Sequence, residues 1–224
     1  MLDQDGEKVT ANNLQNANVS PTGKRAIFEY RGDIFTIPKD EGTWRNLTNS
    51  SGVADRYPIW SPKGDKIAWF SDESGEYELQ IADQKGLNRQ RWKLPNATFY
   101  FTPDWSPDGK HIAYTDTDYN IWAVNTETGT TKKVATDRYA HPNRSMNPIW
   151  SPDSKWIAYV RQLESHFKAA FAYHIDSGET IQLTDGLSDV INPVWDQNGK
   201  YLYFLASTDS VSYTHLTLPT KRIV

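Results

Sequence analysis

The 224-residue sequence contains no cysteine. A disulfide framework, a thiol nucleophile and a zinc site with thiolate ligands are therefore excluded for this chain. The absence of cysteine leaves the compartment open, because proteins without cysteine occur on both sides of membranes.

The chain also lacks long apolar runs and an excess of basic residues. No window approaches 18 consecutive apolar residues, and the opening stretch MLDQDGEKVTANNLQ has no basic segment followed by an apolar one. The sequence therefore predicts neither a membrane-spanning helix nor a secretory signal. With 24 Lys and Arg against 28 Asp and Glu, the formal charge is −4, which argues against nucleic acid as a partner.

What the chain does contain is one recurring phrase, in which a Ser-Pro turn precedes a short apolar strand. Copies begin at Ser20, Ser61, Ser106 and Ser151, and a fifth, DQNGKYLYFL, begins at Asp196. The copies are 41 residues apart once and then 45 residues apart three times. This period is typical of one four-stranded propeller blade.

Each copy has a physical reason for its residues. Proline at the second position sets the φ angle of a turn, and glycine at the fourth accepts positive φ, so the flanking segments fold back as a hairpin. An aromatic residue ends the first strand and can fill the space between neighbouring sheets; these residues are Trp60, Trp105, Trp150 and Trp195. The second strand of a blade is expected, for example, at 67–70 and 112–114. The third strand is expected at 33–37, 77–81, 120–124 and 171–175, and the fourth at 43–48 and 180–184.

The sequence thus predicts an all-β fold, a β-propeller with four-stranded blades. A β-sandwich, the alternative, would give less uniform spacing and no near-identical hairpins. We expect about four complete blades plus partial blades at both ends. Residues 1–19 are assigned to the end of a preceding blade and a linker, with residues 7–10 closing a fourth strand, and residues 20–210 to the blades.

The last 14 residues, VSYTHLTLPTKRIV at 211–224, match no position of the repeat. They resemble the translation of a sequencing-library adapter joined to a truncated reading frame. We expect this segment to be non-native and exclude it from the fold prediction.

No residue pattern for catalysis or metal binding stands out. The histidines, at 111, 141, 166, 174 and 215, form no His-x-x-x-His pair, and no nucleophile elbow, phosphate loop or dinucleotide fingerprint occurs. The acidic stretches at 116–118 and 72–76 lack the ligand pattern of a calcium loop, so solvated hairpin connections are expected. We therefore assign no catalytic residue, no metal ligand and no cofactor.

Binding residues cannot be assigned from the sequence either. Arg89, Arg91 and Lys93 alternate with other residues and could hold a carboxylate or phosphate, but cations on the outer strand of a blade also discourage edge-to-edge pairing, which is the favoured interpretation. Nine Trp and twelve Tyr could suggest carbohydrate stacking. Most of them occupy repeat positions, so core packing is expected.

The repeats resemble the TolB-type propellers, whose blades carry Ser-Pro-Asp-Gly-Lys hairpins. Longer strings outside the repeat phrase are similar to the amino-terminal propeller region of the tricorn protease family; they are FEYRGDIFTIP from Phe28, RNLT from Arg45, FSDESGEYEL from Phe70, TDGLSD from Thr184 and YLYFLAST from Tyr201.

The tricorn resemblance implies a function for the parent protein rather than for this chain alone. In that family a propeller region precedes a PDZ-like module and a serine-peptidase domain. The implied role is a non-catalytic propeller that gates or guides peptides toward a catalytic domain absent from this chain, in a homo-oligomeric parent with peptide or protein substrates. Its relatives are cytoplasmic or exported.

Two alternatives stay open at this point. The chain could be a TolB-like interaction module with no enzyme attached, or it could belong to a prolyl-oligopeptidase-like enzyme whose nucleophile lies in an α/β-hydrolase domain. The sequence downstream of this chain distinguishes them, since only the last predicts a Gly-x-Ser-x-Gly elbow between a strand and a helix.

Overall fold

The computed structural model describes residues 14–139, 146–207, 216–217 and 220–222. Residues 7–10, predicted to close a fourth strand, lie outside the described residues. The described part forms strands and turns without any helix, which confirms the all-β prediction. It accordingly holds no helix of the length and apolarity that crossing a bilayer requires.

The Ser-Pro hairpins share one hydrogen-bond pattern. In four copies the serine Oγ accepts a hydrogen bond from the backbone N–H five residues later at 2.9 to 3.1 Å, and in the fifth copy Asp196 Oδ1 plays this part for Tyr201. Glycine at the fourth position has positive φ in four copies, while Ser154 takes φ 63° in the other. The recurring serines are therefore turn residues.

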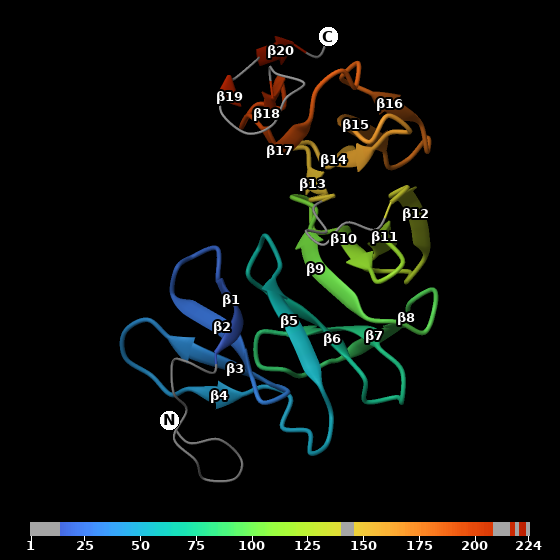
Figure 1. Cartoon of the computed structure of the whole chain (residues 1–224). Coiled ribbons are helices and arrows are strands. Elements are labelled where there is room, and N and C mark those ends of the chain that lie inside the picture. The colour runs from blue at the N-terminus through green and yellow to red at the C-terminus, as the bar shows by residue number, and fades with distance from the viewer. Residues whose placement is uncertain (1–13, 140–145, 208–215, 218–219, 223–224) are drawn as a thin grey trace. The chain divides into compact units, whose positions relative to one another are not determined.

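The strands form five antiparallel sheets (Figure 1), and the first four are four-stranded meanders typical of propeller blades. The first sheet contains β1 (Gln15–Val19), β2 (Arg25–Tyr30), β3 (Asp33–Pro38) and β4 (Arg45–Asn46). The second contains β5 (Asp55–Trp60), β6 (Lys66–Ser71), β7 (Glu78–Asp83) and β8 (Gln90–Lys93). The third contains β9 (Tyr100–Trp105), β10 (His111–Asp116), β11 (Asn120–Asn125) and β12 (Thr131–Thr136).

Two further sheets follow along the chain. The fourth contains β13 (Ile149–Trp150), β14 (Trp156–Gln162), β15 (Lys168–His174) and β16 (Thr180–Gln182). The fifth contains β17 (Val190–Trp195), β18 (Tyr201–Ser207), β19 (Leu216–Thr217) and β20 (Thr220–Arg222). The first strands of sheets two to five end at the four tryptophans, as the repeat predicts.

The first and last sheets include strands that lie outside the predicted blade range 20–210. β1 pairs with β2 and belongs to the first sheet, although it lies in the range 1–19 that was assigned to a preceding blade and a linker. β19 and β20 pair with β18, although they lie in the range 211–224. The foreign origin of that range stays a prediction, since strand pairing does not bear on where a segment comes from.

Contacts divide the chain into two compact units, residues 1–105 with 124–131, and residues 106–123 with 132–224. In the first unit, sheets one and two enclose a core in which Ile27 and Ile34 of the first sheet and Leu47, directly after β4, cluster with Trp60 and Ile67 of the second sheet. Burial of these faces against each other is the main source of stability in such blades.

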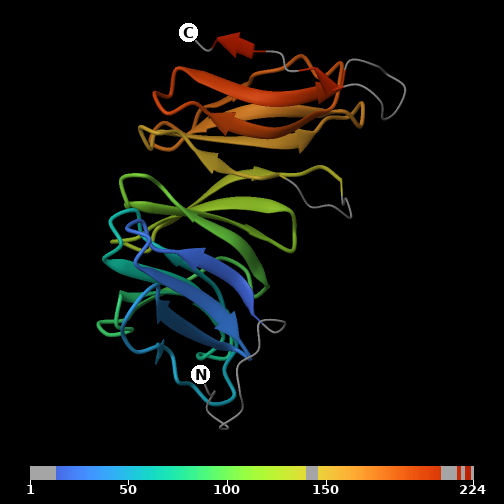
Figure 2. The same cartoon turned by 90° about the vertical axis from the view of Figure 1, so that its left-hand side faces the viewer.

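In the second unit the fourth sheet has apolar residues on both faces. One face carries Trp150, Ile157 and Phe171, and the other carries Val160 and Ala170. The second of these faces packs against Val190, Phe204 and Ala206 of the fifth sheet. Figure 2 shows the strands of these two sheets as adjacent layers, orange and red. The predicted interior role of the repeat tryptophans is confirmed at Trp60 and Trp150.

Gly86→Ala tests the close approach of sheets one and two. Gly86 has φ +78°, and an added Cβ would lie 2.5 Å from the backbone oxygen of Leu47. Because neither the strained φ nor the backbone contact can relax cheaply, we expect the free energy of unfolding to fall by about 2 to 4 kcal/mol in urea denaturation.

Gly52→Ala is the matched control for this change. Gly52 has φ +75°, but an added Cβ would meet nothing within 4 Å. It should cost only the backbone strain, roughly 1 kcal/mol. Equal losses for the two variants would contradict the close packing at Gly86.

Candidate functional site

A cavity of about 420 Å³ lies in the first unit, at the ends of the first two sheets. The turn between β2 and β3, the start of β1 and the segment leading into β5 surround it. Its polar and charged lining residues are Gln15, Glu29, Arg31 and Arg56, and the remaining lining residues are Gly32 and residues 52–54.

The turn at Arg31 and Gly32 shapes this cavity. Both residues have positive φ, 51° and 84°, as the two-residue hairpin between β2 and β3 requires. Gly32 lies so close to the next loop that a Cβ would be 2.7 Å from the backbone oxygen of Val53. The N–H of Asp55 donates to Gly32 O at 2.8 Å, which fixes the turn against the start of β5.

Opposite charges line the same cavity. Glu29 is only 6% exposed, and its Oε2 accepts hydrogen bonds from Asn16 Nδ2 at 2.8 Å and from Tyr57 N at 3.4 Å. Arg31 and Arg56, which carry the positive charges, are exposed residues. Burial, with the charge of Glu29 adding to it, raises the pKa of Tyr57 above its usual value.

This arrangement can bind a polar or charged ligand. The two arginines can donate hydrogen bonds to a carboxylate or a carbonyl oxygen of the ligand, and the carboxylate of Glu29 can accept one from an N–H group of the ligand. The sequence prediction named none of these residues. One signal was present, because Arg31 occupies a hairpin position where Asn or Gly is usual.

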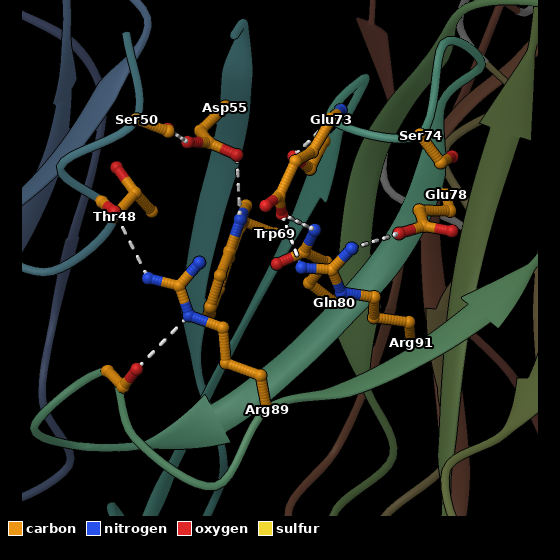
Figure 3. A network of polar contacts seen from close by, with 12 residues as sticks. Thr48, Ser50, Asp55, Trp69, Glu73, Ser74, Glu78, Gln80, Arg89 and Arg91 are labelled. Carbon is orange, nitrogen blue, oxygen red and sulfur yellow. Dashed lines mark hydrogen bonds and ion pairs between the residues drawn. The ribbon is translucent and has the colours of Figure 1, made fainter.

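Asp55, which lies between the cavity-lining residues Ala54 and Arg56 in sequence, anchors a buried network (Figure 3). Trp69 Nε1 donates to Asp55 Oδ1 at 3.0 Å, and Ser50 Oγ donates to Asp55 Oδ2 at 2.8 Å. Asp55 is 2% exposed, and burial raises its pKa although these hydrogen bonds oppose the shift. The network holds the start of β5 in place.

The three cations that the sequence singled out make different contacts. Arg89 precedes β8 and donates to the backbone oxygens of Gly86, Leu47 and Thr48 at 3.1, 2.8 and 3.2 Å, with its guanidinium 5.5 Å from the Trp69 ring centroid. It therefore joins the first two sheets and has a structural role.

Arg91 is held by an ion pair. Its Nη2 lies 2.7 Å from Glu73 Oε2, an oxygen that also accepts a hydrogen bond from Gln80 Nε2 (Figure 3). The hydrogen bond from Gln80, followed by the contact with Arg91, lowers the pKa of Glu73. Lys93 is exposed and faces a second cavity.

The two acidic stretches differ in the structure. Residues 73–76 are exposed, in agreement with a solvated connection, but Asp116 is 2% exposed, so the same prediction was wrong for it. Its Oδ1 accepts hydrogen bonds from the backbone N of Asp118 and Asn120, and its Oδ2 from Asn120 Nδ2 and Trp122 Nε1. Asp116 thus organises a turn that the sequence pattern did not reveal.

The histidines of the described part lie apart from one another and contact aromatic rings. His111 stacks on Trp150, His166 on Tyr139, and His174 meets Trp156 edge-on. Burial lowers the pKa of His111. His141 and His215 lie outside the described residues. No group of three or more His, Asp or Glu side chains suited to a metal ion occurs in the described ranges.

A family model matches residues 14–210, and it describes the second β-propeller domain of tricorn protease. This match spans nearly every described blade strand. The chain belongs to the tricorn second-propeller family. The resemblance noted from the sequence pointed to the amino-terminal propeller region, whereas the matching tricorn model is that of the second propeller.

Similar proteins agree with this tricorn assignment. The crystal structure of the tricorn protease superposes with a TM-score of 0.73 at 19% identity, over 96% of this chain and 22% of that chain, which supports the propeller fold. Dipeptidyl-peptidase 5 of Porphyromonas gingivalis is 28% identical over 145 residues, 60% of this chain and 21% of that protein.

The Tol-Pal system protein TolB of Methylobacillus flagellatus is 31% identical over 97 residues, 43% of this chain and 18% of that protein. The tricorn-type chain thus spans about a fifth of the length of these curated relatives. The relatives include peptidases, while the shared region is the propeller.

Proposed function

We propose that this tricorn-type propeller is a non-catalytic domain of a serine peptidase and that it guides peptide substrates toward a catalytic domain carried elsewhere in the parent. The observation that carries this proposal is the family match over residues 14–210. A peptidase that must spare folded proteins needs a rigid element that admits extended chains, and a propeller offers such an element without a reactive group.

The cavity at Glu29, Arg31 and Arg56 supports a binding role. A passing peptide presents carbonyl oxygens and N–H groups, for which arginine donors and a carboxylate acceptor are suitable partners. The recurring serines are engaged in their own turns, so they are poorly placed to act as nucleophiles.

The test compares the full-length parent with a parent from which the propeller has been removed. We expect the intact enzyme to cleave an unfolded protein much faster than its folded form, and we expect removal to reduce this discrimination by about tenfold or more. Cleavage of a tetrapeptide serves as the control, because its retention shows that the catalytic domain still folds. Unchanged discrimination with retained tetrapeptide cleavage would contradict the guiding role.

A subtler variant tests the cavity itself within the full-length parent. Arg56→Gln should raise KM for peptides and leave kcat nearly unchanged, because Arg56 contacts the substrate away from the reacting bond. Lys63→Gln, at an exposed turn position of the same sheet, is the control and should change neither value. An equal effect of both substitutions would argue against peptide contact at Arg56.

The second candidate function is a TolB-like interaction module with no enzyme attached. The identity of 31% to TolB over 97 residues favours it. Under this alternative the parent gene encodes no peptidase domain, and affinity capture with the parent yields a stable partner protein rather than transiently bound peptides.

A further inference from the structure

A second cavity in the first unit, of about 320 Å³, lies between the hairpin loop that joins β6 to β7 and the segment after β8. Its lining includes Ser74, Tyr77, Glu78, Lys93, Leu94 and Asn96. Tyr100 fixes one wall, because its hydroxyl donates a hydrogen bond to the backbone oxygen of Pro95 at 2.9 Å and also contacts that of Asn96. The cavity is therefore bounded by a hairpin loop and an anchored segment.

Glu78 brings a carboxylate to this cavity that the protein itself satisfies poorly. The residue is 4% exposed, and its Oε1 accepts no hydrogen bond from the described residues. Within the described ranges the ion-pair partner of Oε1 is Arg91 Nη1 at a distance of 3.9 Å, while Arg91 directs Nη2 to Glu73 at 2.7 Å (Figure 3). A buried carboxylate oxygen without a donor is costly, and it is a favourable place for a ligand N–H group.

Lys93 provides the complementary charge. It is the direct cross-strand partner of Glu78 in the β7–β8 pair, a position at which opposite charges usually contact each other. Within the described residues, however, the ion pair of Glu78 is with Arg91, and Lys93 is exposed. The cavity is thus lined by the ammonium group of Lys93 and the carboxylate of Glu78, which do not pair with each other, and also by the exposed Glu76.

We propose that this cavity binds a small zwitterion, an α-amino acid, with its ammonium group on the carboxylate of Glu78 and its carboxylate on the ammonium of Lys93. The ligand ammonium supplies donors to Glu78, and the ligand carboxylate supplies acceptors to Lys93. Leu94 and Ala97 line the cavity as well and give an apolar side chain a surface to contact. The inference is independent of the proposed guiding function.

The test is calorimetric titration of the full 224-residue chain with L-leucine, N-acetyl-L-leucine and L-leucinamide. L-leucine should bind saturably with a Kd of about a millimolar, as expected for a ligand of this size. The acetyl derivative lacks the ammonium group and the amide derivative lacks the carboxylate. Each should therefore bind at least about tenfold more weakly, since a hydrogen bond to a charged group is lost.

Two substitutions report on the protein groups. Glu78→Gln and Lys93→Met should each weaken L-leucine binding at least about tenfold, whereas the control Lys85→Met, an exposed turn residue between β7 and β8, should leave it unchanged. If Glu78→Gln does not fold, the comparison of the three ligands on the unmodified chain still shows whether both charged groups of the ligand are recognised. Absence of saturable binding of L-leucine, or equal affinity for L-leucinamide, would overturn the proposal.

Discussion

Trp60→Ala is expected to lower the free energy of unfolding by about 3 to 5 kcal/mol. Trp60 is 6% exposed and lies in the core between the first two sheets, with Ile27, Ile34 and Leu47 across from it. Removal of the indole loses buried apolar contact area and leaves a cavity. The two hydrogen-bonded sheets cannot move together far enough to fill it. Urea denaturation followed by circular dichroism measures the change.

Trp44→Ala is the matched control, because Trp44 belongs to the same unit but is 41% exposed. Its truncation should cost less than about 1.5 kcal/mol, since much of the ring is already in water. A loss at Trp60 no greater than that at Trp44 would contradict the assignment of the repeat tryptophans to the space between blades.

Asp116→Ala should also destabilise the protein by about 3 to 5 kcal/mol. The substitution removes an acceptor for four hydrogen bonds and leaves the side-chain N–H groups of Asn120 and Trp122 without their partner. Because Asn120 is itself buried, water cannot fully replace the lost carboxylate. Thermal unfolding of the variant measures the loss.

Two further substitutions sharpen this prediction. Asp116→Asn keeps one carbonyl acceptor and should cost about half as much as Asp116→Ala. Asp118→Ala, at an exposed position in the same turn, should stay within about 0.5 kcal/mol of the parent chain. Comparable losses at residues 116 and 118 would show that the network does not stabilise the turn.

Much of the fold could be predicted because each repeat contains the residues that determine its own turn and its adjacent strands. The Ser-Pro hairpins carry their own turn chemistry, so the ends of the first strands at Trp60, Trp105, Trp150 and Trp195 followed from the sequence. The strand β1 was harder to recognise, since its last residue, Val19, stands where the other sheets have tryptophan.

The candidate sites could not be predicted in the same way, because they depend on contacts between segments that the repeat does not specify. Arg31 and Arg56 line one cavity only because Gly32 approaches the backbone of Val53. Likewise, Arg89 and Arg91 look equivalent in sequence, but Arg89 contacts the backbone oxygen of Leu47, and Arg91 the side chain of Glu73. Local sequence patterns therefore predict the blades, whereas contacts between segments distant in sequence determine the candidate sites.

Sequencing of the source gene through and beyond the codon for Ser210 tests the central claim most directly. The account predicts that the native reading frame diverges from residues 211–224 and continues into further propeller sequence, a PDZ-like module and a serine-peptidase core. A native frame that encodes no peptidase domain would contradict the proposed guiding function and would favour the TolB-like interaction module.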